Sequence, residues 1–304
     1  MIDVSIITVN YNNSQLTQDF VLSIIKHTSS EIKYEIIVVD NCSEVDDYKN
    51  LQTLLKDFKV NVVRSLINTG FGGGNMYGYQ YATGEYVAFI NNDVVHIEDC
   101  FSSILPFMKK NKNVGLATPQ QINKDGELVY SYDYYHGIRR TLFGSKGVDV
   151  FRKTKRTKTK YTSPIQVDFT QGCWMLFDSS KFNEIGGFDT NLFLYFEEMD
   201  ISYRLKRKNY LSYFVPDTKF KHLESVSIVK SYAIKKELTI SRLYILRKNH
   251  NYIKYNLIRF YFLIKWVFKS LFKPKHLEMV RIIITGAYLS NSLKHKQQIR
   301  YFSK

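Results

Sequence analysis

The sequence predicts an α/β protein in which a mostly parallel sheet is flanked by helices and followed by a C-terminal helical appendage. Three observations support this prediction. Short apolar runs typical of strands alternate with helix-like stretches through the first 120 residues, and residues from 230 to about 290 carry a helix pattern alone. Hydrophobic residues make up 44% of the 304-residue chain, which is ample for a large buried core.

The alternation in the first 120 residues defines the predicted sheet. The strand-like runs are short and apolar, which suits strands buried on both faces, and they cover Val4–Val9, Glu35–Asp40, Val60–Arg64, Tyr86–Ile90 and Val114–Thr118. The helix-like stretches between them lie around residues 14–28, 46–57, 73–82 and 98–110. Strands separated by helices are typical of a parallel sheet with helices on both faces.

The alternation breaks after residue 120. Residues 120–165 are polar and rich in tyrosine, and their basic end, 151–161, predicts a solvated or mobile loop. Regular structure resumes with a strand-like region, a helix and a strand in residues 167–177, 197–208 and 211–215. These patterns divide the chain into a main body and a tail. The main body has two halves, residues 1–120 and 120–229, and the tail is residues 230–304.

The net charge is concentrated in the tail. The whole chain has 43 Lys/Arg against 28 Asp/Glu, a net charge of +15. Residues 230–304 hold 17 of the basic residues and only two acidic ones, Glu237 and Glu278, so the tail carries +15 and residues 1–229 are neutral. This distribution argues against a general nucleic-acid-binding protein and favours a tail that meets an anionic surface.

The cysteines indicate a reducing compartment, and the hydropathy indicates a chain without a membrane span. Cys42, Cys100 and Cys173 are scattered and show no metal-ligand spacing. The N-terminus enters an apolar strand with Asp3 beside it and lacks the pattern of a signal peptide. No uncharged apolar stretch reaches the roughly 18 residues of a membrane span. We therefore expect a cytoplasmic protein without a transmembrane helix.

Four polar motifs suggest a ligand site. The triplet Asn91-Asn92-Asp93 follows an apolar run and places a carboxylate at the carboxyl edge of the sheet, where open α/β folds bind ligands. A glycine-rich turn in residues 68–75 precedes it, and an acidic cluster in 196–200 and a Lys-His pair in 221–222 follow it. Together these motifs indicate a site for a metal-bound diphosphate with a base opposite it.

The order of the motifs resembles that of a known family. The matching stretches are VSIITVNYNN (4–13), EIIVVDNCS (35–43), NTGFGGGN (68–75), GEYVAFINNDV (84–94), QGCWMLF (171–177), IGGFDTNLFLYFEEMDISYRL (185–205) and FKHLESVS (220–227). They resemble an inverting family-2 glycosyltransferase of GT-A fold, in the bacterial rhamnosyltransferase-like branch. The resemblance implies a Rossmann-like GT-A catalytic domain in residues 1–229, with a nucleotide-sugar half before an acceptor half.

The resemblance also implies a divalent cation, Mg²⁺ or Mn²⁺, bound by Asp93. In the family the last acidic residue of the triplet binds the metal, which offsets the charge that builds on the departing diphosphate. Asn91 stands where the family has its first Asp, and Asn91 and Asn92 are assigned to the donor pocket. His222 aligns with a late histidine that ligates the metal or contacts the diphosphate. A simple turn and a structural histidine are the alternatives.

The nucleotide of the donor is assigned to three other segments. The resemblance implies that Asp40, beside Asn41, contacts the base or ribose. A carboxylate accepts hydrogen bonds from their N–H and hydroxyl groups. A helix N-cap is the alternative. The glycine turn matches neither a Walker A motif nor the GxGxxG fingerprint of NAD-binding proteins. A purely structural turn and loop packing are the alternatives for the remaining candidates, which are Thr8, Asn10, Tyr11, Asn68, Gly70, Gly72, Gly73 and Asn75.

Glu198 is the candidate general base. An inverting transfer needs a carboxylate that takes the proton of the acceptor hydroxyl as its oxygen attacks the anomeric carbon. The family has its base at the second position of a Glu-Asp/Glu-x-Asp motif, which maps to Glu198. Glu197 and Asp200 are expected to share a helix face and to pair with Arg204. The alternative is a solvated helix start, where acidic residues suit the helix dipole.

Residues 254–273 predict an amphipathic helix in the plane of a membrane. At about 100° per residue, the basic positions fall within an arc of about 140°; they are Lys254, Arg259, Lys265, Lys269 and Lys273. The complementary side carries Phe260, Leu263, Ile264, Val267, Phe268 and Leu271. This pattern is typical of a helix that lies on anionic lipid. A helix packed on the main body, with a solvated basic face, is the alternative.

We therefore expect an enzyme at the inner face of the plasma membrane that moves one sugar from a nucleoside-diphosphate donor to a glycan acceptor with inversion. The donor is dTDP-rhamnose or a UDP-hexose, and the acceptor is a polyprenyl-linked precursor of a cell-surface polysaccharide. Two alternatives remain. One is a non-catalytic protein of the same fold that binds nucleotide sugars or glycans, and the other is a nucleic-acid-binding protein that uses the basic tail.

Overall fold

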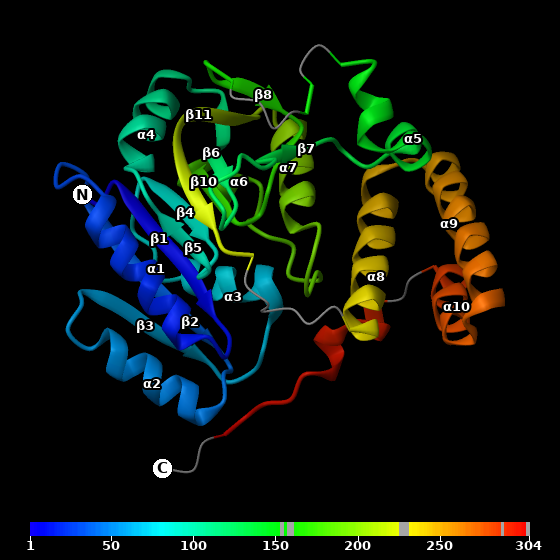
Figure 1. Ribbon diagram of the computed structural model, residues 1–304, viewed down its shortest axis with the longest axis horizontal. Helices are drawn as coiled ribbons and strands as arrows, with labels where there is room; N and C mark the ends of the chain where they lie inside the picture. Colours follow the sequence, from blue (N-terminus) through cyan, green and yellow to red (C-terminus); the bar gives the residue numbers. More distant parts are fainter. Residues whose placement is uncertain (153–154, 157–160, 225–230, 287–288, 302–304) are drawn as a thin grey trace.

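A nine-stranded sheet forms the centre of the computed structural model, which describes residues 1–152, 155–156, 161–224, 231–286 and 289–301. The strand order is β3-β2-β1-β4-β10-β6-β11-β5, and β8 lies beside β11. Helices cover both faces of the sheet, and α8 to α10 lie to one side of it (Figure 1). The predicted α/β fold with a helical C-terminal part is confirmed.

The first half of the chain alternates strands and helices as predicted. Its elements are β1 (Val4–Asn10), α1 (Ser14–His27), β2 (Tyr34–Asn41), α2 (Val45–Leu55), β3 (Val60–Ser65), α3 (Gly70–Tyr79), β4 (Tyr86–Ile90) and α4 (Cys100–Lys110). β1 pairs in parallel with β2 and β4, and β2 pairs in parallel with β3. The helix expected from residue 73 begins at Gly70, so the glycine run is the first turn of α3 and not a turn ahead of it.

The second half adds strands that the sequence patterns show less clearly. Its elements are β5 (Val94–His96), β6 (Val114–Ile122), β7 (Tyr132–Asp133), α5 (Ile138–Asp149), β8 (Ile165–Val167), β9 (Phe169–Thr170), β10 (Trp174–Asp178), α6 (Ser179–Glu184), α7 (Glu197–Arg207) and β11 (Leu211–His222). β10 is antiparallel to β4 and β6, and β11 continues well past the predicted 211–215. The loop predicted in 151–161 lies mostly outside the described residues.

Two buried clusters, one on each face, hold the sheet between its helices. Alternate residues of a strand point to opposite faces. Val4 and Ile6 of β1 therefore join the cluster under α1, α2 and α4, whereas Ile7 joins the cluster under α3, α6 and α7. Every residue of β4 is buried, as expected for a central strand that is covered on both faces. This rigid sheet fixes the positions of the loops at its edge.

The C-terminal part consists of helices with a buried cluster of their own. They are α8 (Tyr232–Asn249), α9 (Tyr252–Phe272), η1 (Pro274–His276), α10 (Leu277–Thr285), η2 (Leu289–Asn291) and η3 (Leu293–Lys296). Their cluster includes Leu243, Ile258 and Met279. Among the helices that the structure describes, none is both long enough and apolar enough to cross a membrane.

Helix α8 also packs on the main body. Its Ile245 lies in one buried cluster with Leu192, Phe196 and Met199, which belong to α7 and the loop before it. α8 therefore serves two clusters, one in the body and one in the appendage. The boundary expected between residues 229 and 230 falls outside the described residues.

Candidate active site

The register between β5 and β11 brings Asp93 and His222 together. The triplet turns the chain out of β4, with the carbonyl of Asn91 accepting a hydrogen bond from the Val94 amide at 3.1 Å. β5 then pairs antiparallel with β11, and His222 lies opposite Val94. His222 Nε2 consequently lies 3.1 Å from Asp93 Oδ1, although 129 residues separate the two in sequence.

The chemistry of this pair suits a divalent cation bound to a diphosphate. Asp93 is 6% exposed, and His222 Nδ1 lies 3.1 Å from Gln121 Nε2. Burial lowers the pKa of His222, but Cys173 and Asp93 together raise it. Over the residues described, no group of three or more His, Cys, Asp or Glu could enclose a metal. Two protein ligands are typical of Mg²⁺ or Mn²⁺ when phosphate oxygens and water complete the coordination.

The segment before β10 joins the triplet to the acidic cluster. The Asn91 amide donates a hydrogen bond to the Cys173 carbonyl at 2.9 Å. The preceding residue, Gly172, has no side chain, and a Cβ there would lie 3.7 Å from Glu198 Oε2. A Cβ on Gly72 of α3 would in turn lie 3.6 Å from the Cγ of the neighbouring glutamate, Glu197. The triplet, the glycine-rich helix and the acidic cluster therefore meet in one place.

Glu198 has the properties that a base requires. It lies in the first turn of α7 and is partly exposed. Its carboxylate has no hydrogen-bond or ion-pair partner among the residues that the structure describes. Burial raises the pKa of Glu198 to about 7, and the negative charge of Asp133 adds to this effect. A carboxylate of this kind binds a proton readily near neutral pH.

The other two acidic residues of α7 are less suited to proton transfer. Glu197 is 3% exposed, and burial together with Glu198 raises its pKa well above the usual range. Asp200 is fully buried, and its Oδ2 lies 2.8 Å from Arg204 Nε. The expected pairing with Arg204 is thus confirmed for Asp200 and wrong for Glu197, which has no ion pair with any residue described. Glu197 is buried instead beneath the glycines of α3.

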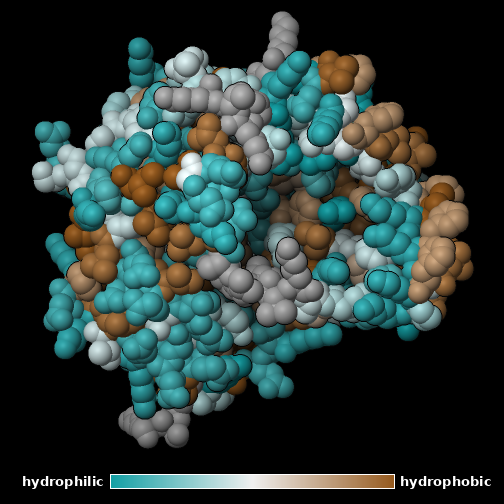
Figure 2. Space-filling view, viewed as in Figure 1, coloured by the Kyte–Doolittle hydropathy of each residue, from teal (hydrophilic) through white to brown (hydrophobic). Residues whose placement is uncertain are grey.

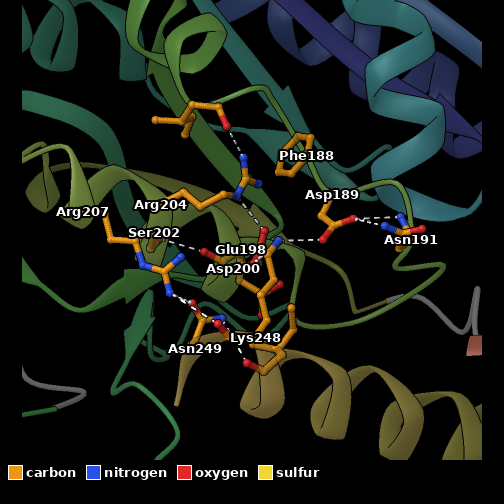
Figure 3. Close-up of polar contacts among 12 residues, drawn as sticks. Phe188, Asp189, Asn191, Glu198, Asp200, Ser202, Arg204, Arg207, Lys248 and Asn249 are labelled. Atoms are coloured by element: carbon orange, nitrogen blue, oxygen red, sulfur yellow. Dashed lines mark hydrogen bonds and ion pairs between the residues drawn. The ribbon is translucent and has the colours of Figure 1, made fainter. Parts of the chain in front are cut away.

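Lys248 of α8 connects the appendage to the acidic cluster. Its Nζ lies 2.6 Å from Asp189 Oδ2 and 2.8 Å from Asp200 Oδ1, so that it sits between the two carboxylates (Figure 3). Tyr244, one turn earlier, donates a hydrogen bond to Asp189 at 2.8 Å. Sequence reasoning missed Lys248 because it is one of 17 basic residues in the tail, and nothing local distinguishes it.

Replacing Lys248 with methionine is expected to destabilise the protein by about 2 kcal/mol, since the buried Asp200 would lose one of its two cations. Arg204 remains in place, and Lys248 is 28% exposed, which limits the loss. Chemical denaturation of the purified variant measures the change in the free energy of unfolding. Lys254→Met, at an exposed position of α9, is the matched control and should unfold like the parent. Equal stability of both variants would contradict the role of Lys248.

The predicted donor residues at the ends of β1 and β2 are largely buried. The strand register places Asn10 beside Asp40, and Asn10 Nδ2 donates a hydrogen bond to Asp40 Oδ1 at 3.2 Å. Arg64 Nε lies 3.3 Å from the other carboxylate oxygen of Asp40. Thr8 is also buried, and its hydroxyl has no hydrogen-bond partner in the described part of the chain. Tyr11 is the exposed member of this group.

Most of the remaining predicted donor residues shape the start of α3. Asn41 Oδ1 accepts a hydrogen bond from the Thr69 amide at 3.0 Å, and Asn68 Oδ1 accepts one from the Gly70 amide at 2.9 Å. Gly70 has φ +74°, and a Cβ there would lie 2.0 Å from the Phe193 carbonyl oxygen, so only glycine fits. Asn75 bonds the Phe71 carbonyl within α3. These contacts hold the helix N-terminus against the loop that precedes α7.

The two residues left, Gly73 and Asn92, also have close neighbours. Gly73 lies against Thr69, whose Cβ is 2.7 Å from where a Cβ on Gly73 would be. Asn92 Nδ2 donates a hydrogen bond to the Thr17 hydroxyl at 3.0 Å, which fixes the triplet against α1. The structure thus places every predicted site residue along one edge of the sheet or beside it.

The match to a family model decides the classification. The model described as glycosyl transferase family 2 matches residues 5–186, more than half of the chain. The chain belongs to glycosyl transferase family 2. Its matched region contains the triplet, the glycine-rich helix and Gly172, whereas the acidic cluster and His222 lie beyond it.

Family members of several kinds are similar to this chain. A hexosyltransferase of low-salt glycan biosynthesis, Agl10 of Haloferax volcanii, is 29% identical over 68% of the chain and 62% of its own length. The rhamnosyltransferase WbbL of Escherichia coli is 24% identical over 66% of the chain and 76% of its own length. The match thus spans less than two thirds of the Haloferax protein.

Solved structures show the same fold at low sequence identity. GalNAc-T7 with UDP, GalNAc and Mn²⁺ has a TM-score of 0.59 at 19% identity, covering 79% of this chain and 47% of the other. S. aureus TarS 1–349 in complex with UDP-GlcNAc has a TM-score of 0.55 at 14% identity, covering 84% of this chain and 70% of the other. Both support the GT-A architecture that the sequence predicted.

Proposed function

We propose that this glycosyltransferase is inverting and metal-dependent and that it moves one sugar from a nucleoside-diphosphate donor to a glycan acceptor. One observation carries the proposal. Glu198, a partly exposed carboxylate without an ion pair among the described residues, lies beside Gly172, and the next residue, Cys173, bonds Asn91 of the triplet that contains Asp93. This arrangement supports a base close to a binding site for a metal-bound diphosphate, as a single displacement requires.

The residues divide the reaction between them. Glu198 accepts the proton of the acceptor hydroxyl while that oxygen forms its bond to the anomeric carbon. The bond from that carbon to the diphosphate breaks on the opposite side, so the configuration inverts. Asp93 and His222 would hold Mg²⁺ or Mn²⁺, which supplies charge to stabilise the leaving diphosphate. Burial and the charge of Glu198 raise the pKa of Glu197 well above its usual range, which favours the neutral form of Glu197 beside the base.

Relatives support the choice of donor class. The hexosyltransferase and the rhamnosyltransferase named above favour a sugar donor of the dTDP-rhamnose or UDP-hexose type. UDP in GalNAc-T7 and UDP-GlcNAc in TarS support a nucleoside-diphosphate donor, and Mn²⁺ in the former supports the metal. The rhamnosyltransferase-like branch, and an acceptor that is a polyprenyl-linked surface polysaccharide precursor, belong to the same proposal.

The rate of transfer is expected to depend on the ionisation of Glu198. Since the base must be unprotonated and its pKa is raised to about 7, kcat/KM should rise about tenfold per pH unit below 7 and level off above it. A pH profile measured between about 5.5 and 9 checks this, with donor affinity measured over the same range as the control. A rate that is constant or falls over this range would contradict Glu198 as the base.

The appendage is proposed to attach the enzyme to the inner face of the cytoplasmic membrane. Along α9, a stripe of apolar side chains faces solvent, and it consists of Ile253, Leu257, Phe260, Ile264, Val267, Phe268 and Leu271. Of the predicted apolar side, only Leu263 packs inward. Figure 2 shows apolar residues gathered along the edge of the molecule formed by α9. An exposed apolar stripe on a highly basic helical part is typical of binding to anionic lipid.

Replacing Phe260, Phe268 and Leu271 with serine is expected to release the protein from anionic vesicles, because each side chain is more than 60% exposed and free to insert. Co-sedimentation with vesicles of phosphatidylglycerol measures the effect, which we expect to be at least about tenfold. The matched control replaces three exposed apolar residues of the body, Leu22, Ile25 and Leu66. Equal sedimentation of both triple variants would contradict the proposed membrane face.

A further inference from the structure

A cavity of about 310 Å³ lies between α8, α9 and η1 in the appendage. Apart from Thr239, its polar lining is basic: Lys235 and Arg242 come from α8, Lys265 and Lys269 from α9, and His276 from η1. No Asp or Glu lines it, and Trp266 forms part of its apolar wall. A concave site with several cations and no acidic residue has the chemistry of an anion-binding site.

Arg242 in this cavity has no anionic partner among the residues that the structure describes. Its guanidinium lies 5.5 Å from the ring centroid of Phe196 and 5.1 Å from that of Phe262. Its Nε is buried without a hydrogen-bond acceptor, and the guanidinium forms no ion pair with any described residue. Burial lowers the pKa of Arg242, and Arg140 adds to the effect. A buried cation without a partner is costly, so a bound anion at this point would be stabilising.

The other basic groups of the cavity are also unpaired. Lys235, Lys265 and Lys269 make no ion pair with the described residues, and Lys269 Nζ lies 4.8 Å from the ring centroid of Trp266. Neighbouring lysines of α8 differ, because Lys236 pairs with Glu278 at 2.5 Å and a later one bridges Asp189 and Asp200. The Nδ1 atom of His276 is buried and has no hydrogen-bond partner in the described part of the chain.

The position of the cavity suggests the molecule that supplies the anion. Its α9 wall belongs to the helix whose other side carries the exposed apolar stripe. Its Arg242 lies over the ring of Phe196, the residue directly before Glu197 and Glu198. An anion bound here would lie between the membrane-facing side chains and the helix that carries the base.

We propose that this cavity binds the diphosphate head group of the lipid that carries the acceptor glycan, while the lipid tail stays in the bilayer beside α9. The proposal rests on the proposed function, since it assumes a lipid-linked acceptor. Four cationic side chains match the two to three negative charges of a diphosphate, and Arg242 supplies the fork of donors that phosphate oxygens accept. The glycan beyond the diphosphate would then extend toward Glu198.

Binding of farnesyl diphosphate, a soluble isoprenoid diphosphate, tests the proposal directly. Calorimetry on the full chain in EDTA excludes metal-dependent binding of the diphosphate at Asp93 and His222. Lys265→Gln with Lys269→Gln should weaken binding about tenfold or more, because each lysine loses a charge-assisted contact. Lys254→Gln with Arg281→Gln removes the same charge from exposed positions outside the cavity and should change binding less than about twofold. Arg242→Lys keeps the positive charge but loses the paired N–H donors of the guanidinium, so it should weaken binding as well.

The outcomes separate the possible sources of the anion. Equal losses in the two double variants would show general attraction to a basic surface and would overturn the proposal. Inorganic pyrophosphate binding as tightly as farnesyl diphosphate would assign the cavity to a free anion and overturn the lipid part. If Lys265→Gln with Lys269→Gln weakens binding to phosphatidylglycerol vesicles as much as binding to farnesyl diphosphate, the cavity would be assigned to bulk lipid. That outcome would also overturn the proposal. Because these measurements need no sugar donor, a failure of the proposed transferase reaction would show separately, as an absence of donor turnover.

Discussion

Replacing Glu198 with glutamine is expected to lower turnover by roughly 10²–10⁴, the range in which general-base catalysis contributes. Glutamine keeps the shape of the side chain and cannot accept the proton of the acceptor hydroxyl. The carboxylate has no hydrogen-bond or ion-pair partner among the described residues, so folding should be unaffected. Steady-state kinetics with a soluble acceptor measures the loss, and donor binding should survive because Glu198 is not among the residues proposed to bind the donor.

The neighbouring acidic residues provide the controls for this experiment. Glu197→Gln changes a buried group whose raised pKa favours its neutral form, so it should retain most activity. Asp200→Asn should lower stability, because the buried carboxylate would lose its charge beside Arg204 and Lys248. If Glu197→Gln is inactive while Glu198→Gln turns over normally, the base has been assigned to the wrong residue.

Replacing Asp93 with asparagine is expected to cost at least about 10² in turnover, since the metal loses its carboxylate ligand and the departing diphosphate loses the charge that stabilises it. Asparagine keeps a polar contact to His222 Nε2, which now lies 3.1 Å from the carboxylate. A titration with Mn²⁺, followed by its paramagnetic resonance, should show weakened binding. Removal of the metal from the parent enzyme with EDTA should produce a similar loss.

Asn92→Ala is the matched control for the metal site. It changes the adjacent residue of the triplet, whose side chain bonds Thr17 and not the Asp93–His222 pair. We expect its Mn²⁺ affinity to stay close to that of the parent. Full activity of Asp93→Asn, or of the parent enzyme in EDTA, would show that the transfer does not depend on a metal at this position.

The parts of the fold that the sequence predicted correctly depend on local patterns. The five early strands are predominantly apolar and are separated by helix-like stretches, so each is visible within its own segment. β5 and β7 have three and two residues, too few for any periodicity. The start of α3 at Gly70 was also missed, because glycine disfavours helix by propensity and is required there by the close approach of Phe193.

The candidate site also has parts that the sequence predicts and parts that depend on the fold. The proximity of Asp93 and His222 was expected only from the family resemblance, since it depends on strand pairing between residues far apart in sequence. The bridge by Lys248 and the basic cavity could not be predicted, because each gathers residues from elements whose packing no local pattern encodes. The raised pKa of Glu198 likewise results from burial by the surrounding fold, which a sequence motif does not reveal.

The contact of Lys248 with Asp189 and Asp200 has a consequence for how this enzyme can be recombined with its relatives. A chimera that takes its C-terminal helices from another family member inherits a foreign residue at this position. Unless that residue is also a cation, two acidic side chains of the recipient are left without their shared counter-charge. The C-terminal helices are therefore exchangeable only as a unit together with the segment 185–200. Among chimeras joined at residue 230, we expect the stable ones to carry a lysine or arginine at the position of Lys248.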